Sequence, residues 1–170
     1  MGQYLFGKKE IDTLILGFDG AGKSTMIEMI KKKENQGPRI GFAMESVNYR
    51  NLKLTAFDFG GMEKLRLLFR TFYASAQAII FVIDSTDRNR FENVKYEFNQ
   101  LINEEVIKKT VPFLIFANKQ DSNDRMTVDE ISKGLGLEKL KDRTWFIQAT
   151  DAIKGDGVFE GFEWLINIVK

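Results

Sequence analysis

Residues 17–24 read Gly-Phe-Asp-Gly-Ala-Gly-Lys-Ser, and this stretch decides the fold. It matches the pattern GxxxxGK[ST], in which a glycine-rich loop joins a buried strand to the start of a helix. Glycines let consecutive backbone N–H groups curve around an anion, and the helix N-terminus adds partial positive charge. A flexible glycine-rich turn is the alternative, but an apolar run precedes this loop and a helical pattern follows it. The stretch therefore predicts a phosphate-binding loop.

The residue types of this loop have separate chemical tasks. Lys23 is expected to reach the β- and γ-phosphate oxygens, and Ser24 to give its hydroxyl to Mg²⁺. The predicted contacts of the loop to the nucleotide are Asp19, Gly20, Ala21, Gly22, Lys23, Ser24 and Thr25.

Short apolar runs alternate with longer segments of helical period along the chain, which is typical of a parallel sheet covered by helices. The predicted strands are 12–17, 78–84, 111–118 and 144–148, and the predicted helices are 23–33, 92–107, 128–134 and 158–169. The segments 45–50 and 52–58 pivot on Arg50 and Asn51 and predict an antiparallel hairpin. We expect an α/β fold with a mostly parallel six-stranded sheet and helices on both faces. Residues 1–170 are expected to form one domain, with residues 1–10 as a short N-terminal extension.

Composition excludes several kinds of chemistry. The 170 residues contain no cysteine and no histidine, so disulfides, Cys/His zinc sites, cysteine nucleophiles and histidine bases are ruled out. The net charge of +1 gives no electrostatic reason to expect nucleic acid as a partner. The longest apolar runs fall far short of the roughly 20 residues of a membrane-spanning helix. The three apolar residues 4–6 are too few for a secretory signal, so a cytoplasmic location is expected.

The base of the nucleotide is predicted by residues 118–121, Asn-Lys-Gln-Asp, which follow a buried strand. The carboxyl ends of parallel strands are where open α/β sheets bind ligands. Asp121 can accept hydrogen bonds from the N1–H and 2-amino groups, which guanine has and adenine lacks. The stem of Lys119 can lie along the base, and the amide of Asn118 can tie this loop to the phosphate-binding loop. A plain polar loop is the alternative, and the phosphate-binding loop makes it the weaker one.

A third motif, Asp-Phe-Gly-Gly at residues 58–61, ends the second hairpin strand. Asp58 can hold a water bound to Mg²⁺, and the N–H of Gly61 can bond a γ-phosphate, so this loop would respond to the third phosphate. Standing alone, the motif is an ordinary glycine-rich turn. Asp151 and Ala152 follow another strand, where their backbone N–H groups could face the guanine O6.

In order and spacing, the stretches GFDGAGKST, PRIGF, DFGG, NKQD and IQATDAIKGDGVFEGFEWL resemble those of the Arf and Arf-like GTPases. The resemblance covers nearly the whole chain. It implies a Ras-like P-loop G domain that binds GTP or GDP with Mg²⁺, acts in vesicle trafficking and sits peripherally on an endomembrane. It also implies an exchange factor, an activating protein and an effector as partners, and Ala152 as the guanine O6 contact. The effector region would include Phe42, Phe57 and Phe72, for which core packing is the alternative.

The chain departs from the family's pattern at catalytic positions. Arg39 stands where the family has a Mg²⁺-binding Thr, and a guanidinium cannot ligate a cation. Met62 stands where the family has the Gln that orients the attacking water. Gly2 is present, but Phe6 replaces the Ser or Thr of the myristoylation motif.

Lys23, Gly61 and the Met62 position are therefore the catalytic candidates, and slow hydrolysis is expected. Two function classes stay open: a slow GTPase switch, and a nucleotide-loaded binding module with little or no hydrolysis. An adenylate-using kinase or ATPase is disfavoured by residues 118–121.

Overall fold

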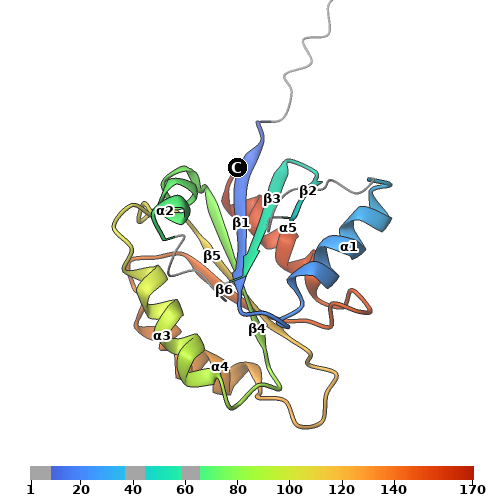
Figure 1. Ribbon diagram of the computed structural model, residues 1–170, viewed down its shortest axis with the longest axis vertical. Helices are drawn as coiled ribbons and strands as arrows, with labels where there is room; N and C mark the ends of the chain where they lie inside the picture. Colours follow the sequence, from blue (N-terminus) through green and yellow to red (C-terminus); the bar gives the residue numbers. More distant parts are fainter. Residues whose placement is uncertain (1–8, 37–44, 59–65) are drawn as a thin grey trace, which may run out of the picture.

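A computed structural model describes residues 9–36, 45–58 and 66–170, and shows one sheet flanked by helices (Figure 1). The sheet has six strands in the order β2-β3-β1-β4-β5-β6. Only β2 and β3 pair antiparallel, and the other neighbours run parallel. The strands are β1 (Ile11–Gly17), β2 (Glu45–Tyr49), β3 (Leu52–Asp58), β4 (Ala78–Asp84), β5 (Phe113–Asn118) and β6 (Trp145–Ala149). The helices are α1 (Lys23–Lys33), α2 (Arg66–Ser75), α3 (Phe91–Ile102), α4 (Val128–Leu135) and α5 (Val158–Ile168), with a 3₁₀ turn at Leu137–Lys139.

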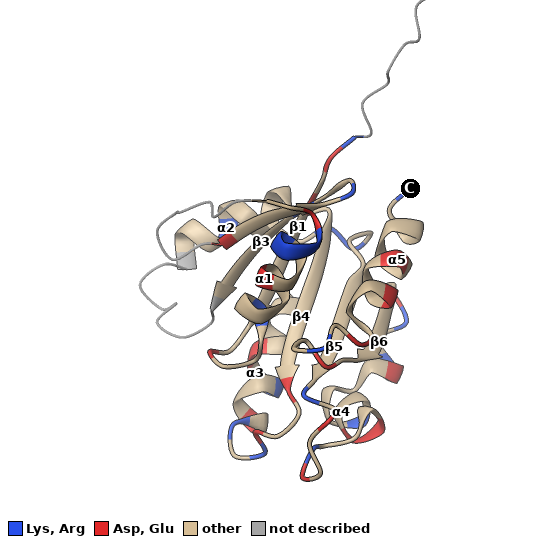
Figure 2. Cartoon of the chain, turned by 90° about the vertical axis from the view of Figure 1, so that its right-hand side faces the viewer, with Lys and Arg blue, Asp and Glu red and all other residues tan. Residues whose placement is uncertain are grey.

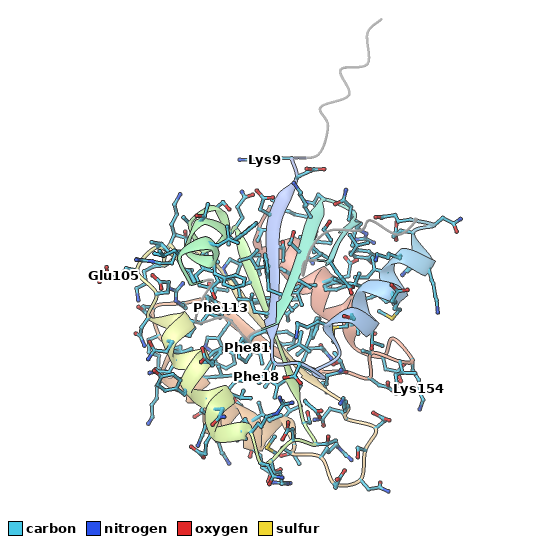
Figure 3. The ribbon with its side chains drawn as sticks, viewed as in Figure 1. Lys9, Phe18, Phe81, Glu105, Phe113 and Lys154 are labelled. Carbon is cyan, nitrogen blue, oxygen red and sulfur yellow. The ribbon has the colours of Figure 1, made fainter. Side chains whose placement is uncertain are left out.

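The central strands are apolar along their whole length because helices cover both faces of the sheet. One core cluster packs the sheet against α2, α3 and α4, and a second packs it against α1 and α5. Phe81 and Phe113 lie inside the molecule beneath α3 (Figure 3), and each ring contacts Phe98. The predicted α/β fold, with its mostly parallel six-stranded sheet and helices on both faces, is confirmed.

The predicted hairpin is also confirmed. Arg50 turns the chain with a φ of 52°, in the left-handed region, and the Asn51 carbonyl accepts a hydrogen bond of 2.7 Å from the N–H of Ile11. Both signs of charge are scattered over the helices and loops (Figure 2). No helix in the described ranges is long and apolar enough to cross a membrane.

Most predicted boundaries differ from the structure by no more than one residue, but two were wrong by more. The strand expected from Val111 begins at Phe113, since Pro112 has no N–H to give to a ladder. The helix expected to run to Ile107 ends at Ile102. The buried guanidinium of Arg143 donates to the carbonyls of Ile102 and Ile107, and so binds the chain where it leaves the helix.

Helix α2 was not predicted, and it changes the interpretation of the aromatic residues. Phe57 is 4% exposed and its ring lies 5.1 Å from Phe69 and 5.0 Å from Phe72, centroid to centroid. Phe57 therefore belongs to the core under α2, so for this residue the core-packing alternative holds. Phe72 is half-buried against the same cluster. Phe42 lies outside the described residues.

Candidate guanine-nucleotide site

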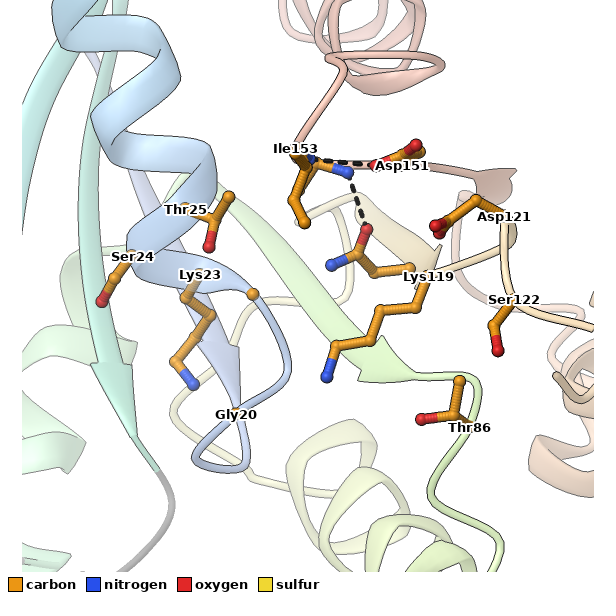
Figure 4. Close-up of a pocket in the computed structure, with 13 residues that line it drawn as sticks. Gly20, Lys23, Ser24, Thr25, Thr86, Lys119, Asp121, Ser122, Asp151 and Ile153 are labelled. Carbon is orange, nitrogen blue, oxygen red and sulfur yellow. Dashed lines mark hydrogen bonds between the residues drawn. The ribbon is translucent and has the colours of Figure 1, made fainter. Parts of the chain in front are cut away.

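The predicted phosphate-binding loop, the loop 118–121 and the loop after β6 meet in one pocket at the carboxyl ends of the parallel strands (Figure 4). The pocket encloses about 440 Å³. Its lining residues are Gly20, Gly22, Lys23, Ser24, Thr25, Thr86, Asn118, Lys119, Asp121, Ser122, Asp151, Ala152 and Ile153. The sequence reasoning missed Thr86, Ser122 and Ile153. Thr86 follows β4 at the same edge of the sheet, so its place after a buried strand was the available signal.

Backbone geometry explains the glycines of the phosphate-binding loop. Gly20 and Gly22 have φ values of 75° and 108°, where L side chains are strained. A Cβ at Gly22 would also collide with the amide of Asn118. Helix α1 begins at Lys23 with no side-chain cap and no acidic residue in its first turn. Its first N–H groups therefore offer positive partial charge to an anion in the pocket.

The ammonium of Lys23 is held inside the loop. Its Nζ donates to the carbonyls of Gly17 at 2.8 Å and Phe18 at 2.7 Å, and the residue is buried. A cation surrounded by these carbonyls, at a helix N-terminus, is suited to phosphate.

Arg90, which the sequence reasoning missed, fixes the outer turn of this loop. Its guanidinium donates to the Asp19 carboxylate at 2.7 Å and to the Asp19 carbonyl at 2.9 Å. Its Nε donates to Asp87 at 2.5 Å. The hydrogen bond from Arg90 and its charge hold the pKa of Asp19 below its usual value. The Asp19 carboxylate therefore anchors the phosphate-binding loop to Arg90.

Asn118 joins three loops, and its expected tie to the phosphate-binding loop is confirmed. Its Nδ2 donates to the Ala21 carbonyl at 2.8 Å. Its Oδ1 accepts from Thr150 Oγ1 at 3.1 Å and from the N–H of Ala152 at 3.0 Å. Because the Ala152 amide donates to Asn118 in this structure, its contact to the guanine O6 stays a prediction. Asn118 is 2% exposed, so its amide connects these loops beneath the surface of the protein.

Lys119 extends along the pocket and ends on an acidic residue of β4. Its Nζ donates to Asp84 Oδ2 at 2.5 Å, and Thr86 donates to Asp84 Oδ1 through both its N–H and its hydroxyl. Burial raises the pKa of Asp84, but the hydrogen bonds from Lys119 and Thr86 outweigh it, so the pKa lies below its usual value. The ion pair fixes the Lys119 stem beside the space that a base would occupy.

The carboxylates of Asp121 and Asp151, on the base side of the pocket, differ in how far they are already hydrogen-bonded within the protein. Asp121 lines the pocket and is exposed. Asp151 is buried, and its Oδ1 accepts from the N–H groups of Ile153 and Lys154 at 3.1 and 3.3 Å. The Asp151 side chain therefore shapes its own loop, whereas Asp121 is available to a ligand.

The oxygens beside the phosphate-binding loop are suited to Mg²⁺. Ser24 Oγ donates to Glu45 Oε1 at 3.2 Å, while Glu45 Oε2 is buried without a hydrogen-bond partner in the described structure. Neighbouring ligands of octahedral Mg²⁺ lie about 3.0 Å apart for metal–oxygen distances of about 2.1 Å. The Ser24 hydroxyl and Glu45 Oε1 lie close to that spacing, and Glu45 Oε2 has no partner among the described residues, so this oxygen cluster fits a hard cation. Asp58 ends β3 and is paired with Gly17 in the parallel register of β1 and β3. Arg39, Gly61 and Met62 lie outside the described ranges.

The strand order, the phosphate-binding loop and the loop 118–121 at its side define a Ras-like P-loop G domain. A model of the ADP-ribosylation factor family matches residues 1–169. ADP-ribosylation factor J of Dictyostelium discoideum is 45% identical over 163 residues, which cover 95% of this chain and 86% of that protein. ADP-ribosylation factor-like protein 1 of Saccharomyces cerevisiae is 44% identical over 164 residues, 95% of this chain and 89% of that protein. ADP-ribosylation factor K of D. discoideum is 44% identical over 163 residues, with 95% and 86% covered.

The chain belongs to the ADP-ribosylation factor family. It is a GTP-binding switch protein that takes GTP and GDP, and regulators and effectors are its general class of partner.

Proposed function

We propose that this protein binds GTP or GDP with Mg²⁺ in the pocket described above and hydrolyses GTP slowly. The observation that carries the proposal is the Asn118 amide, which joins the phosphate-binding loop to the two loops that would hold the base. We expect a nucleotide to span the same elements, with its phosphates on the lining residues of the phosphate-binding loop and its base beside Lys119, Asp121 and residues 151–153.

On the phosphate side, Lys23 and the first N–H groups of α1 neutralise the anion. On the base side, the Lys119 stem forms one wall, and the Asp121 carboxylate accepts from the N1–H and 2-amino groups of guanine. Adenine offers neither donor in that arrangement, so binding it would leave the carboxylate unsatisfied, which costs more than a missing contact alone.

Ser24, Asp58 and Glu45 are the residues that would hold Mg²⁺. When bound, the ion offsets the charge of the β- and γ-phosphates. The hydroxyl of Ser24 and the Glu45 oxygen that has no partner among the described residues support this assignment.

Hydrolysis is expected to be slow for reasons of residue chemistry. Unassisted small GTPases turn over at about 10⁻⁴ s⁻¹ even with the Gln that positions water. A thioether at Met62 is a poor hydrogen-bond partner, and Arg39 supplies no hydroxyl to the metal. These same residues favour the alternative, a nucleotide-loaded binding module with little or no hydrolysis.

An effector is proposed to contact α2, because Leu67 and Leu68 on this helix are 84% and 53% exposed. Large apolar side chains placed side by side at the surface suit a protein partner. We extend the proposal to vesicle trafficking in the cytoplasm with peripheral contact to an endomembrane, on the strength of the family alone.

Competition for a fluorescent GDP analogue tests the base assignment. GDP and GTP should bind about 10²-fold or more tightly than ADP and ATP. Asp121→Asn should shift preference toward xanthine nucleotides, while Asp124→Asn, on the same loop but outside the pocket lining, should not. Equal affinity of the wild-type protein for ATP and GTP would remove the assignment.

Single-turnover hydrolysis of loaded GTP, with and without cell extract, separates the two classes. A rate that extract raises indicates a switch with an activating partner. GTP that persists in both conditions indicates the loaded binding module.

A further inference from the structure

The turn after β5 is strained at the point where it presents the guanine-reading residue. Lys119 has a φ of 64°, in the left-handed region that side chains other than glycine rarely adopt. Such residues persist where the surrounding structure holds them, and they concentrate at functional sites. Some other group must therefore hold this turn.

Asp121, two residues on, depends on that turn for its direction. Its carboxylate has no hydrogen-bond or ion-pair partner within residues 9–36, 45–58 and 66–170. No neighbouring side chain in those ranges aims the carboxylate, so the backbone of the turn does.

Gln120 lies between these two residues and bonds in four directions. Its Nε2 donates to Ser85 Oγ at 2.8 Å and to the Met126 carbonyl at 2.9 Å. Its Oε1 accepts from Arg125 Nε at 3.2 Å, and its backbone N–H donates to the Thr150 carbonyl at 3.1 Å. One residue thereby links the end of β4, the loop before α4 and the loop after β6.

Ser85, the residue directly after β4, is a rigid partner for the Gln120 side chain. Ser85 is fully buried, its N–H donates to the Asn118 carbonyl at 3.0 Å, and its carbonyl accepts from the N–H of Met126 at 2.7 Å. Because both backbone groups of Ser85 are engaged, its hydroxyl is a fixed acceptor for the Gln120 amide. The Gln120 side chain therefore connects the strained turn to the buried end of β4.

We propose that Gln120 is a positioning residue for guanine specificity. Its side-chain amide holds the strained turn so that the Asp121 carboxylate faces the N1–H and 2-amino groups together. This inference rests on the proposed binding of guanine nucleotides in the pocket and assigns the aim of Asp121 to Gln120.

The ratio of GDP affinity to inosine diphosphate affinity tests the proposal. Hypoxanthine keeps N1–H and O6 but lacks the 2-amino group, so this ratio reports the second hydrogen bond to Asp121. In Gln120→Met, which has a similar length and no amide, the ratio should fall about fivefold or more, because two donors and an acceptor are lost. A residue with a merely structural role would lower both affinities in the same proportion and leave the ratio unchanged.

Gln77→Met is the matched control, since Gln77 also accepts through its amide oxygen, from the N–H of Asp12 at 3.1 Å, and lies outside the pocket lining. Its ratio should equal that of the wild-type protein. Ser85→Ala removes one acceptor and should lower the ratio by a smaller amount, about twofold.

An unchanged ratio in Gln120→Met overturns the proposal, and if that variant does not fold, an unchanged ratio in Ser85→Ala does so. Failure of the proposed function gives a different result, because the wild-type protein would then show no preference for GDP over ADP.

Discussion

Replacing Asn118 by Ala should weaken both the fold and the nucleotide site. The change removes the hydrogen bonds to the Ala21 carbonyl, the Thr150 hydroxyl and the Ala152 N–H, which are 2.8, 3.1 and 3.0 Å long. At about 1 kcal/mol for each buried hydrogen bond, the free energy of unfolding should fall by about 3 kcal/mol. For a chain of 170 residues, that loss lowers the Tm by about 6–12 °C.

Nucleotide binding should suffer as well, because the phosphate-binding loop and the base loops are no longer held together before the ligand arrives. In the variant, the bound nucleotide must itself hold these loops together. If this uses most of the 3 kcal/mol, GDP affinity falls by about tenfold to a hundredfold. Thermal unfolding and the release rate of a fluorescent GDP analogue measure the two effects. Asn103→Ala is the control, since the Asn103 amide caps α3 at an exposed position. A variant Asn118→Ala with wild-type Tm and GDP release would refute the reasoning.

Three further outcomes are expected. Glu45→Gln should raise the Mg²⁺ concentration needed to slow GDP release, by about threefold or more, because a neutral amide is a weaker ligand. The control Glu97→Gln, on α3 and outside the pocket lining, should not, and identical Mg²⁺ curves would contradict the assignment. The pKa of Asp84 is raised by burial but lowered more by hydrogen bonds led by that from Lys119, so its stabilisation is complete above about pH 5 and is lost as pH falls through the folded pKa. The difference in unfolding free energy between wild type and Asp84→Asn should therefore shrink below about pH 4, and a constant difference would argue against the ion pair. Met62→Gln should raise the single-turnover rate of GTP hydrolysis, and an unchanged rate would show that the water is positioned by another group.

The sequence by itself determined the features that depend on residues close together in the chain. The alternation of apolar runs with helical segments reports which faces are buried, so the six strands and four of the helices could be placed from it. The phosphate-binding loop could be predicted because its backbone needs glycine where φ is positive, as at Gly20 and Gly22. The tie of Asn118 to that loop spans 97 residues, but it too could be predicted, because Asn118 belongs to a motif that occurs together with a phosphate-binding loop.

Outside such motifs, the tertiary structure alone decided which side chains far apart in sequence meet. The Arg90 guanidinium bonds Asp19, which lies 71 residues earlier in the chain, and Ser24 donates a hydrogen bond to Glu45, 21 residues later. No pattern in the chain fixes such pairs, because they depend on how a loop after one strand turns toward another. The same holds for Phe57, an aromatic that would suit either a surface or a core. Packing by a helix that the sequence did not reveal places Phe57 in the core, because only the fold determines what covers a side chain.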